Sequence, residues 1–186
     1  MSDPIFVIQG IADGAQGHPY DEILSLAVCK VLPDEGEFET VFAETVQVEP
    51  RFVGKPKLDY AESKGLNVPD LYTGMPLPEM VSRFHEIVDG QYITSYDIRQ
   101  MFTRYLCNDP WDVTGTSHIM PSISTRQPIS LKCKYPEDEP DIIVKAYRRT
   151  FRNDPIGAGK RRGALELAQM ASMLLISLRE RGKYRF

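Results

Sequence analysis

The chain has 186 residues, of which 42% are hydrophobic and 26% are charged. This composition supports a buried core and excludes an intrinsically disordered chain. The length fits one domain, so we expect residues 1–186 to form a single globular unit. The formal net charge of -4 and the pI of about 5.4 argue against a dedicated nucleic-acid binder, which is usually basic.

Three strands are predicted in the first part of the chain. Residues 5–11 form an almost wholly apolar run that ends at a turn over residues 13–14, typical of a central strand buried on both faces. Residues 22–32 are mostly aliphatic, and residues 38–48 are rich in Val, Thr and Phe. A turn signal over residues 33–36 separates these two runs, so we expect an antiparallel hairpin.

The middle of the chain predicts loops and two helices around a short strand. Residues 49–78 are rich in Pro and Gly and predict mostly loop, with a short helix near residues 58–64. Residues 78–88 have apolar side chains at helical spacing, and residues 91–95 predict a strand. Asp97 then stands where it can cap the next helix.

The last part of the chain predicts irregular structure followed by two helices. Residues 108–134 give the weakest signal, and within them residues 121–128 have no period and predict a long surface loop. Residues 136–140 predict an acidic turn, and residues 142–151 and 162–181 predict helices, the second being the longest. The whole order predicts an α/β sheet with an antiparallel edge hairpin and helices on its faces.

No run is long enough to cross a membrane, and the start of the chain lacks the basic and apolar regions of a signal peptide. We therefore expect no membrane contact and a cytoplasmic location. Cys29, Cys107 and Cys133 are widely spaced and form no Cys-x-x-Cys pair. This spacing predicts free thiols that are buried or partly buried, and it argues against a zinc site.

Charge is distributed unevenly along the chain. Residues 142–186 carry eleven Lys or Arg and three acids, a net charge of +8, whereas the remainder carries −12. Such a basic segment attracts phosphate backbone, or it pairs with the acidic body of the same molecule or of a second copy, which we favour slightly. Lys160, Arg161 and Arg162 precede a helix, whose free backbone amides suit an anion, so they are the candidate phosphate contacts. A solvated loop is the alternative, because the spacing does not match a P-loop.

Five segments match one protein family in order and spacing. Residues 6–12, with the sequence Phe-Val-Ile-Gln-Gly-Ile-Ala, and residues 20–28 are similar to its first two strands. Residues 74–84, 146–151 and 164–168 are similar to three of its helices. The chain thus resembles the DEDD-type 3′–5′ exonucleases of the ribonuclease-H-like superfamily, which include the proofreading subunit of bacterial replicative polymerase. The resemblance implies a mixed five-stranded sheet, flanked by helices, whose first three strands are antiparallel.

The resemblance also implies that the catalytic residues are missing. Members of the family hold two divalent metals with four carboxylates, and many use a His or Tyr as general base. At the carboxylate positions this chain has Gly10, Ala12, Gln100 and Leu167. Arg162 stands at the position of the general base. Two divalent cations about 4 Å apart need several negative ligands, so we expect no metal cofactor and no two-metal catalysis.

Displaced carboxylates are the alternative to this loss. Asp13, Asp97 and Glu166 lie near the motif positions, with Asp21 and Asp112 close by in sequence. At least three of these five carboxylates must converge to bind magnesium or manganese. The simpler interpretation assigns Asp13 to a turn, Asp97 to a helix N-cap and the others to solvent, with apolar packing around Leu167 filling the former cleft.

The sequence therefore predicts a catalytically degenerate 3′–5′ exonuclease homologue that acts as a binding or scaffold protein, with enzyme activity not expected. Its expected partner is another protein, a second copy, or nucleic acid held through Lys160, Arg161 and Arg162. A divergent metal-dependent exonuclease and a nucleic-acid binder without cleavage are the alternatives. The identity of the partner, DNA or RNA, the oligomeric state, the pathway and the fate of the former cleft stay open.

Overall fold

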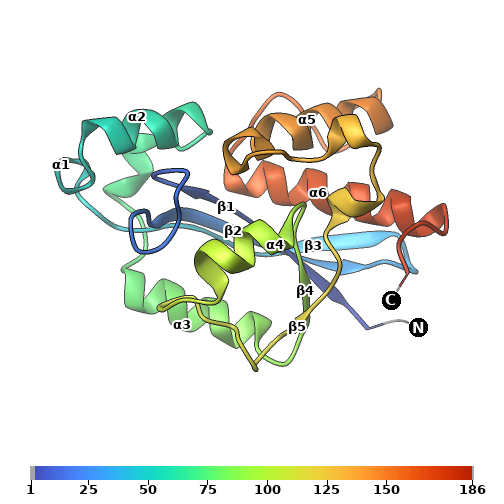
Figure 1. Cartoon of the computed structure of the whole chain (residues 1–186), viewed down its shortest axis with the longest axis horizontal. Helices are drawn as coiled ribbons and strands as arrows, with labels where there is room; N and C mark the ends of the chain where they lie inside the picture. Colours follow the sequence, from blue (N-terminus) through green and yellow to red (C-terminus); the bar gives the residue numbers. More distant parts are fainter. Residues whose placement is uncertain (1–2, 186) are drawn as a thin grey trace.

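The structure, a computed structural model, describes residues 3–185. A mixed sheet with strand order β3-β2-β1-β4-β5 lies between two layers of helices (Figure 1). The strands are β1 (Ile5–Ala12), β2 (Ile23–Leu32), β3 (Glu37–Thr45), β4 (Tyr92–Thr94) and β5 (His118–Ile119). β1, β2 and β3 pair antiparallel, whereas β4 runs parallel to both β1 and β5. The predicted α/β class with an antiparallel opening is confirmed.

The helices are α1 (Pro50–Val53), α2 (Lys55–Ser63), α3 (Leu77–Val88), α4 (Ile98–Met101), α5 (Glu139–Thr150) and α6 (Ala164–Glu180). A π-helical turn, Phe102–Leu106, continues α4. Short 3₁₀ turns occupy Val68–Leu71, Ile123–Arg126, Ile129–Leu131 and Pro136–Asp138. Within the described residues no helix has the length and apolarity needed to cross a membrane.

The two faces of the sheet bury separate apolar clusters, because successive side chains of a strand point to opposite faces. Phe6 and Ile8 of β1 pack in the cluster that includes Phe84 of α3. Ile5 and Val7 pack in the cluster on the α6 face. α6 contacts β1, β2 and β3, and α5 packs against α6 rather than on the sheet (Figure 1). Both faces of β1 are therefore buried, as its apolar sequence predicted.

Three element predictions need correction. Residues 49–78, predicted mostly as loop, contain α1, α2 and a 3₁₀ turn, because Pro50 and Pro56 occupy first-turn positions where proline is tolerated. α5 begins at Glu139, within the predicted acidic turn, for the same reason. Residues 121–128, predicted as a surface loop, contain the 3₁₀ turn Ile123–Arg126, and they are not only surface, because Ile123 is 0% exposed.

β3 forms one edge of the sheet and mixes exposed polar residues with the partly buried or buried side chains of Phe38, Val41 and Phe42. Glu37 and Glu39 are exposed, and Glu39 pairs with Lys30 of β2 at 3.6 Å. The other edge, β5, has only two residues. All three cysteines are free, with Cys29 buried and the others partly buried, which confirms the prediction.

Candidate functional site

Four of the five degenerate motif positions meet at one cavity of about 70 Å³. Gly10 and Ala12 come from β1, Gln100 from α4 and Leu167 from α6, and all four line this cavity. β1 and β4 are parallel neighbours, so the carboxyl end of β1 and the segment that follows β4 meet at the same edge of the sheet. The convergence of these positions is a property of the fold, and none of the four side chains carries a charge.

Gly10 lies on the sheet side of the cavity, where little space is available for a side chain. A Cβ atom at this position would lie 3.2 Å from the Ser25 carbonyl oxygen and 3.2 Å from Leu26 Cδ1, and 3.6 Å from Met101 Cε. A carboxylate at position 10 would therefore have to displace its neighbours, since these distances are tighter than ordinary packing.

Leu167 closes the cavity on the α6 side. Its side chain is 1% exposed and belongs to the apolar cluster on that face of the sheet. Apolar packing around the former cleft is present in part, because Ile11 and Met101 also line the cavity, but polar and charged side chains line it as well.

Three polar atoms around the cavity have no hydrogen-bond partner. They are Gln9 Nε2, Gln100 Oε1 and the Tyr105 hydroxyl. Gln9 is 2% exposed and Tyr105 is 8% exposed, so water at the molecular surface does not reach them freely. An unpartnered buried polar group costs about 1–3 kcal/mol. Such groups normally meet an ordered water or a ligand.

Two cationic side chains line the same cavity. Lys64 Nζ donates a hydrogen bond to the Glu137 carbonyl at 2.8 Å, and it lies 5.4 Å from the centroid of the Tyr60 ring. Arg104, in the π-helical turn, is partly buried, and within residues 3–185 its guanidinium has no hydrogen-bonded or ion-paired partner. The Arg104 stem passes so close to Gly17, which has φ of +82°, that a Cβ there would lie 2.9 Å from Arg104 Cβ.

Glu139, at the start of α5, is the carboxyl group of the cavity wall. Its pKa is raised to about 7, mainly by burial and also by the charge of Asp97. Three groups lower this pKa: the Asp97 backbone N–H, which donates to Glu139 Oε1 at 3.1 Å, the Gln9 amide, and the charge of Arg104. The Gln9 contact is weak, because Nε2 reaches no hydrogen-bond geometry. Near neutral pH a large fraction of Glu139 is uncharged, and the cavity carries net positive charge.

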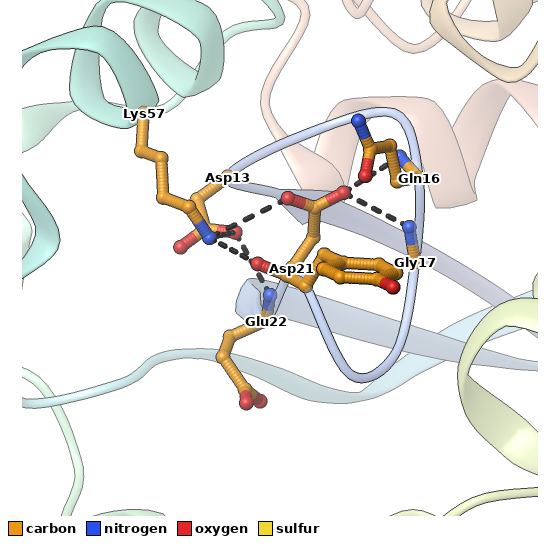
Figure 2. Close-up of polar contacts among 7 residues, drawn as sticks. Asp13, Gln16, Gly17, Asp21, Glu22 and Lys57 are labelled. Carbon is orange, nitrogen blue, oxygen red and sulfur yellow. Dashed lines mark hydrogen bonds and ion pairs between the residues drawn. The ribbon is translucent and has the colours of Figure 1, made fainter.

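Asp13 and Asp21, two of the displaced-carboxylate candidates, lie close together on either side of Lys57. They are 5% and 6% exposed, and Lys57 Nζ lies 3.4 Å from an oxygen of each (Figure 2). The same ammonium donates to the Tyr20 carbonyl. Lys57 reaches this position from α2, so a protein cation holds the two carboxylates together.

Backbone amides complete the partners of these two carboxylates. The N–H groups of Gln16 and Gly17 donate to Asp21 Oδ2 at 2.6 and 2.9 Å, and the Glu22 N–H donates to Asp13 Oδ1 at 2.8 Å (Figure 2). Their hydrogen bonds close the loop between β1 and β2. These contacts confirm the turn predicted for Asp13.

The other displaced-carboxylate candidates lie elsewhere. Asp97 caps α4 and accepts from the Gln100 N–H at 3.5 Å, as predicted, while Asp112 accepts from the Thr114 N–H at 2.8 Å. Glu166 lines a separate surface hollow near the start of α6. Within residues 3–185, no group of three or more His, Cys, Asp or Glu side chains is placed to hold a metal ion. The convergence that a displaced metal site requires is therefore not met.

The predicted basic contacts lie beside the cavity and not in it. Arg162 forms an ion pair with Asp141 of α5 and lines two surface hollows, so its expected place at a general-base position in the cleft is wrong. Lys160 and Arg161 are exposed. One hollow gathers Lys145, Arg148, Lys160 and Arg162 around Asp141. Internal pairing of the basic segment is also present, because Arg179 pairs with Asp34 at 2.9 Å.

Asp154 fixes the loop that carries these basic residues. It has φ of +46°, a conformation uncommon outside glycine and asparagine. Its carboxylate accepts hydrogen bonds from the Tyr147 hydroxyl at 2.8 Å and from the Gly159 N–H at 3.0 Å. The Tyr147 hydrogen bond is the largest cause that lowers the pKa of Asp154. The segment before α6 is thus anchored to α5.

The motif positions alone did not predict which polar groups surround the cavity. Gln9 carried a signal, because it is the only polar side chain in the apolar run of β1. Lys64, the adjacent pair Arg104 and Tyr105, and Glu139 come from three distant parts of the sequence, and they meet where α2, the π-helical turn and α5 surround the end of β1.

No family model matches the sequence, and no curated protein matches it. Solved structures with a similar fold do exist. One, a full-length 3′-exonuclease, has a TM-score of 0.63 and 12% identity over 98% of this chain and 84% of that chain. Another, a 3′-exonuclease shown in 3′-end-specific recognition of a histone mRNA stem-loop, has a TM-score of 0.52 and 15% identity over the same shares. This likeness shows a ribonuclease-H-like, exonuclease-like fold, as the sequence predicted.

Proposed function

We propose that this protein is a catalytically degenerate 3′–5′ exonuclease homologue that binds single-stranded nucleic acid without cleaving it. The convergence of Gly10, Ala12, Gln100 and Leu167 on one cavity carries the proposal. These are the positions at which the motif alignment expects carboxylates, and their side chains supply only one neutral oxygen. Two divalent metals need several anionic ligands, which this set does not provide.

Nucleic acid is the partner that the charges around the cavity favour. Lys64 and Arg104 line the cavity, and the hollow of Lys145, Arg148 and Lys160 lies on the adjacent α5 surface. Cationic side chains in such an arrangement supply the sequence-independent attraction to phosphates. The neighbour shown in 3′-end-specific recognition of an RNA stem-loop supports RNA 3′ ends as the first ligand to test.

A nuclease assay tests the loss of catalysis. Labelled single-stranded DNA and RNA are incubated with the protein in magnesium and in manganese, beside an active 3′-exonuclease. We expect no hydrolysis by the wild type. The matched variants are Glu139→Gln, in the cavity wall, and Asp97→Asn, whose backbone N–H donates to Glu139 Oε1. Cleavage by the wild type that disappears in either variant would overturn the proposal.

A binding assay tests the nucleic-acid contact. We expect single-stranded RNA to bind with an affinity that falls with salt, by roughly 0.7 units of log slope for each phosphate contact. Replacing Lys160, Arg161 and Arg162 by Gln is expected to weaken binding and to flatten this slope. Replacing Arg181, Lys183 and Arg185 by Gln removes the same charge at the opposite end of α6 and is the matched control.

The two triple variants separate specific contact from general charge. Equal weakening in both would contradict a site near the start of α6. Absence of any binding would turn the search to a protein partner or a second copy, which light scattering detects as a mass above the 21.1 kDa of one chain.

A further inference from the structure

The cavity contains more hydrogen-bonding capacity than the protein itself uses. Gln9 Nε2 has no partner although Gln9 is 2% exposed, and the Tyr105 hydroxyl has none although Tyr105 is 8% exposed. The Arg104 guanidinium, with five N–H donors, also lacks a hydrogen-bonded partner within residues 3–185. Unmatched groups of this kind, gathered around one space, point to a ligand or to ordered water.

Donors outnumber acceptors around this space. Arg104 and Lys64 present N–H groups only, Gln9 has an unpartnered amide N–H group beside its carbonyl oxygen, and the Tyr105 hydroxyl donates or accepts. Gln100 Oε1 and the Glu139 carboxyl are further side-chain acceptors of the wall, and burial keeps much of Glu139 protonated near neutral pH. The complementary ligand therefore carries negative charge and several acceptor oxygens.

The size of the cavity restricts the ligand further. The space for a bound group is about 70 Å³, and the cavity opens to the surface, so a terminal phosphate can enter it while the rest of a strand lies outside. Glu139 is the carboxyl group of the wall and is only partly ionised near neutral pH, so the two cations of the wall are not fully balanced and an anion would complete the charge balance.

We propose that the cavity is an oxyanion site that binds the terminal phosphate monoester at the 3′ end of a nucleic-acid strand, through Arg104, Lys64, Gln9 and Tyr105. This inference rests on the proposed function and names the end group that the site selects. Protein cations and neutral donors contact the phosphate directly, in place of metal ions. A phosphate monoester carries a charge between about −1.5 and −2 near neutral pH, so it pairs with both cations more strongly than a terminal hydroxyl does.

The experiment compares two ends on the same strand. A fluorescein-labelled 12-nucleotide RNA is prepared with a 3′-phosphate and with a 3′-hydroxyl, and fluorescence anisotropy gives both dissociation constants. We expect the 3′-phosphate to bind about tenfold tighter to the wild type, as charge-assisted hydrogen bonds predict. Arg104→Gln is expected to bind both ends alike. Arg99→Gln, an exposed neighbour outside the cavity, is expected to keep the preference.

Two further measurements guard against misfolding and identify the source of the phosphate. Circular dichroism confirms that Arg104→Gln is folded, and Lys64→Gln tests the same site from α2, with a partial loss of preference expected. Thermal unfolding in inorganic phosphate, with chloride at equal ionic strength as reference, is expected to show a stabilisation of the wild type that Arg104→Gln lacks.

Each outcome separates this inference from the proposed function. Equal binding of both RNA ends to the wild type would overturn the inference and leave nucleic-acid binding intact. No RNA binding, with stabilisation by inorganic phosphate that depends on Arg104, would support the oxyanion site and overturn the nucleic-acid ligand. No RNA binding and no effect of phosphate would overturn both.

Discussion

At the scale of single residues, Lys57 contributes the positive charge that keeps two buried carboxylates together. Asp13 and Asp21 lie within 3.4 Å of its ammonium and are almost fully buried, while Lys57 is itself 38% exposed (Figure 2). The two carboxylates are both negatively charged, and neighbouring like charges repel strongly where water is scarce. The side chain from α2 therefore neutralises the two carboxylates whose hydrogen bonds close the loop between β1 and β2.

Replacing Lys57 by Met removes this counter-charge. The two buried carboxylates then keep their backbone hydrogen bonds but lose their ion-pair partner. We expect a loss of about 1–3 kcal/mol in the free energy of unfolding at neutral pH, measured by urea denaturation. Lys55→Met is the matched control on the same helix, since Lys55 is exposed and pairs with the exposed Asp59, and we expect a much smaller loss than for Lys57→Met. Equal losses in the two variants would show that Lys57 is not a structural counter-charge.

Glu139 makes the stability of the protein depend on pH. Its pKa is raised from 4.5 to about 7 in the folded protein, so the folded state holds a proton that the unfolded state releases. The wild type is therefore expected to lose about 2–3 kcal/mol relative to Glu139→Gln as the pH rises from 4.5 to 8. Urea denaturation of both proteins across this range measures the difference. A difference that stays constant with pH would contradict the raised pKa.

At the scale of elements, apolar periodicity predicted well where a segment packs against one continuous surface. The three opening strands and α6 follow from their apolar runs alone. The π-helical turn after α4 does not, because its sequence is compatible with an ordinary helix and the longer repeat arises from packing. This turn contains both Arg104 and Tyr105, so the least predictable element supplies two groups of the candidate site.

The sequence predicted where the motif positions meet better than it predicted the directions of the side chains around them. The alignment placed Gly10, Ala12, Gln100 and Leu167, and they do share one cavity. Arg162 was expected in the cleft at a general-base position. It instead forms an ion pair with Asp141 on the neighbouring helix and does not line the cavity. The long-range contacts that set side-chain direction cannot be derived from spacing along the chain.

The start of α4 depends on Asp97. Its carboxylate accepts from the Gln100 N–H and from the Ser122 hydroxyl, which itself accepts from the Ile98 N–H. Asp97→Ala is expected to lower the free energy of unfolding by about 1 kcal/mol, the usual effect of losing an N-cap. Asp97→Asn retains a capping oxygen and is expected to lose less than half of that. Chemical denaturation measures both, and similar losses would show that the cap is unimportant.

At the scale of the whole molecule, the absence of a carboxylate cluster in residues 3–185 has a direct thermodynamic test. A ligand present at 100 times its dissociation constant stabilises a protein by about 2.7 kcal/mol, which corresponds to several degrees in Tm at this size. We expect no rise in Tm with magnesium or manganese at millimolar concentration. A rise that Glu139→Gln abolishes would reveal a metal site at the cavity.

The acidic edge strand β3 has a consequence for the behaviour of the protein at high concentration. An exposed edge presents unpaired backbone groups to any second strand, and such edges promote aggregation unless charge protects them. Glu37 and Glu39 are exposed on β3, so two copies that approached edge to edge would bring like charges together. Part of the negative charge of residues 1–141 thus protects the sheet from self-association while the basic segment stays available for a ligand.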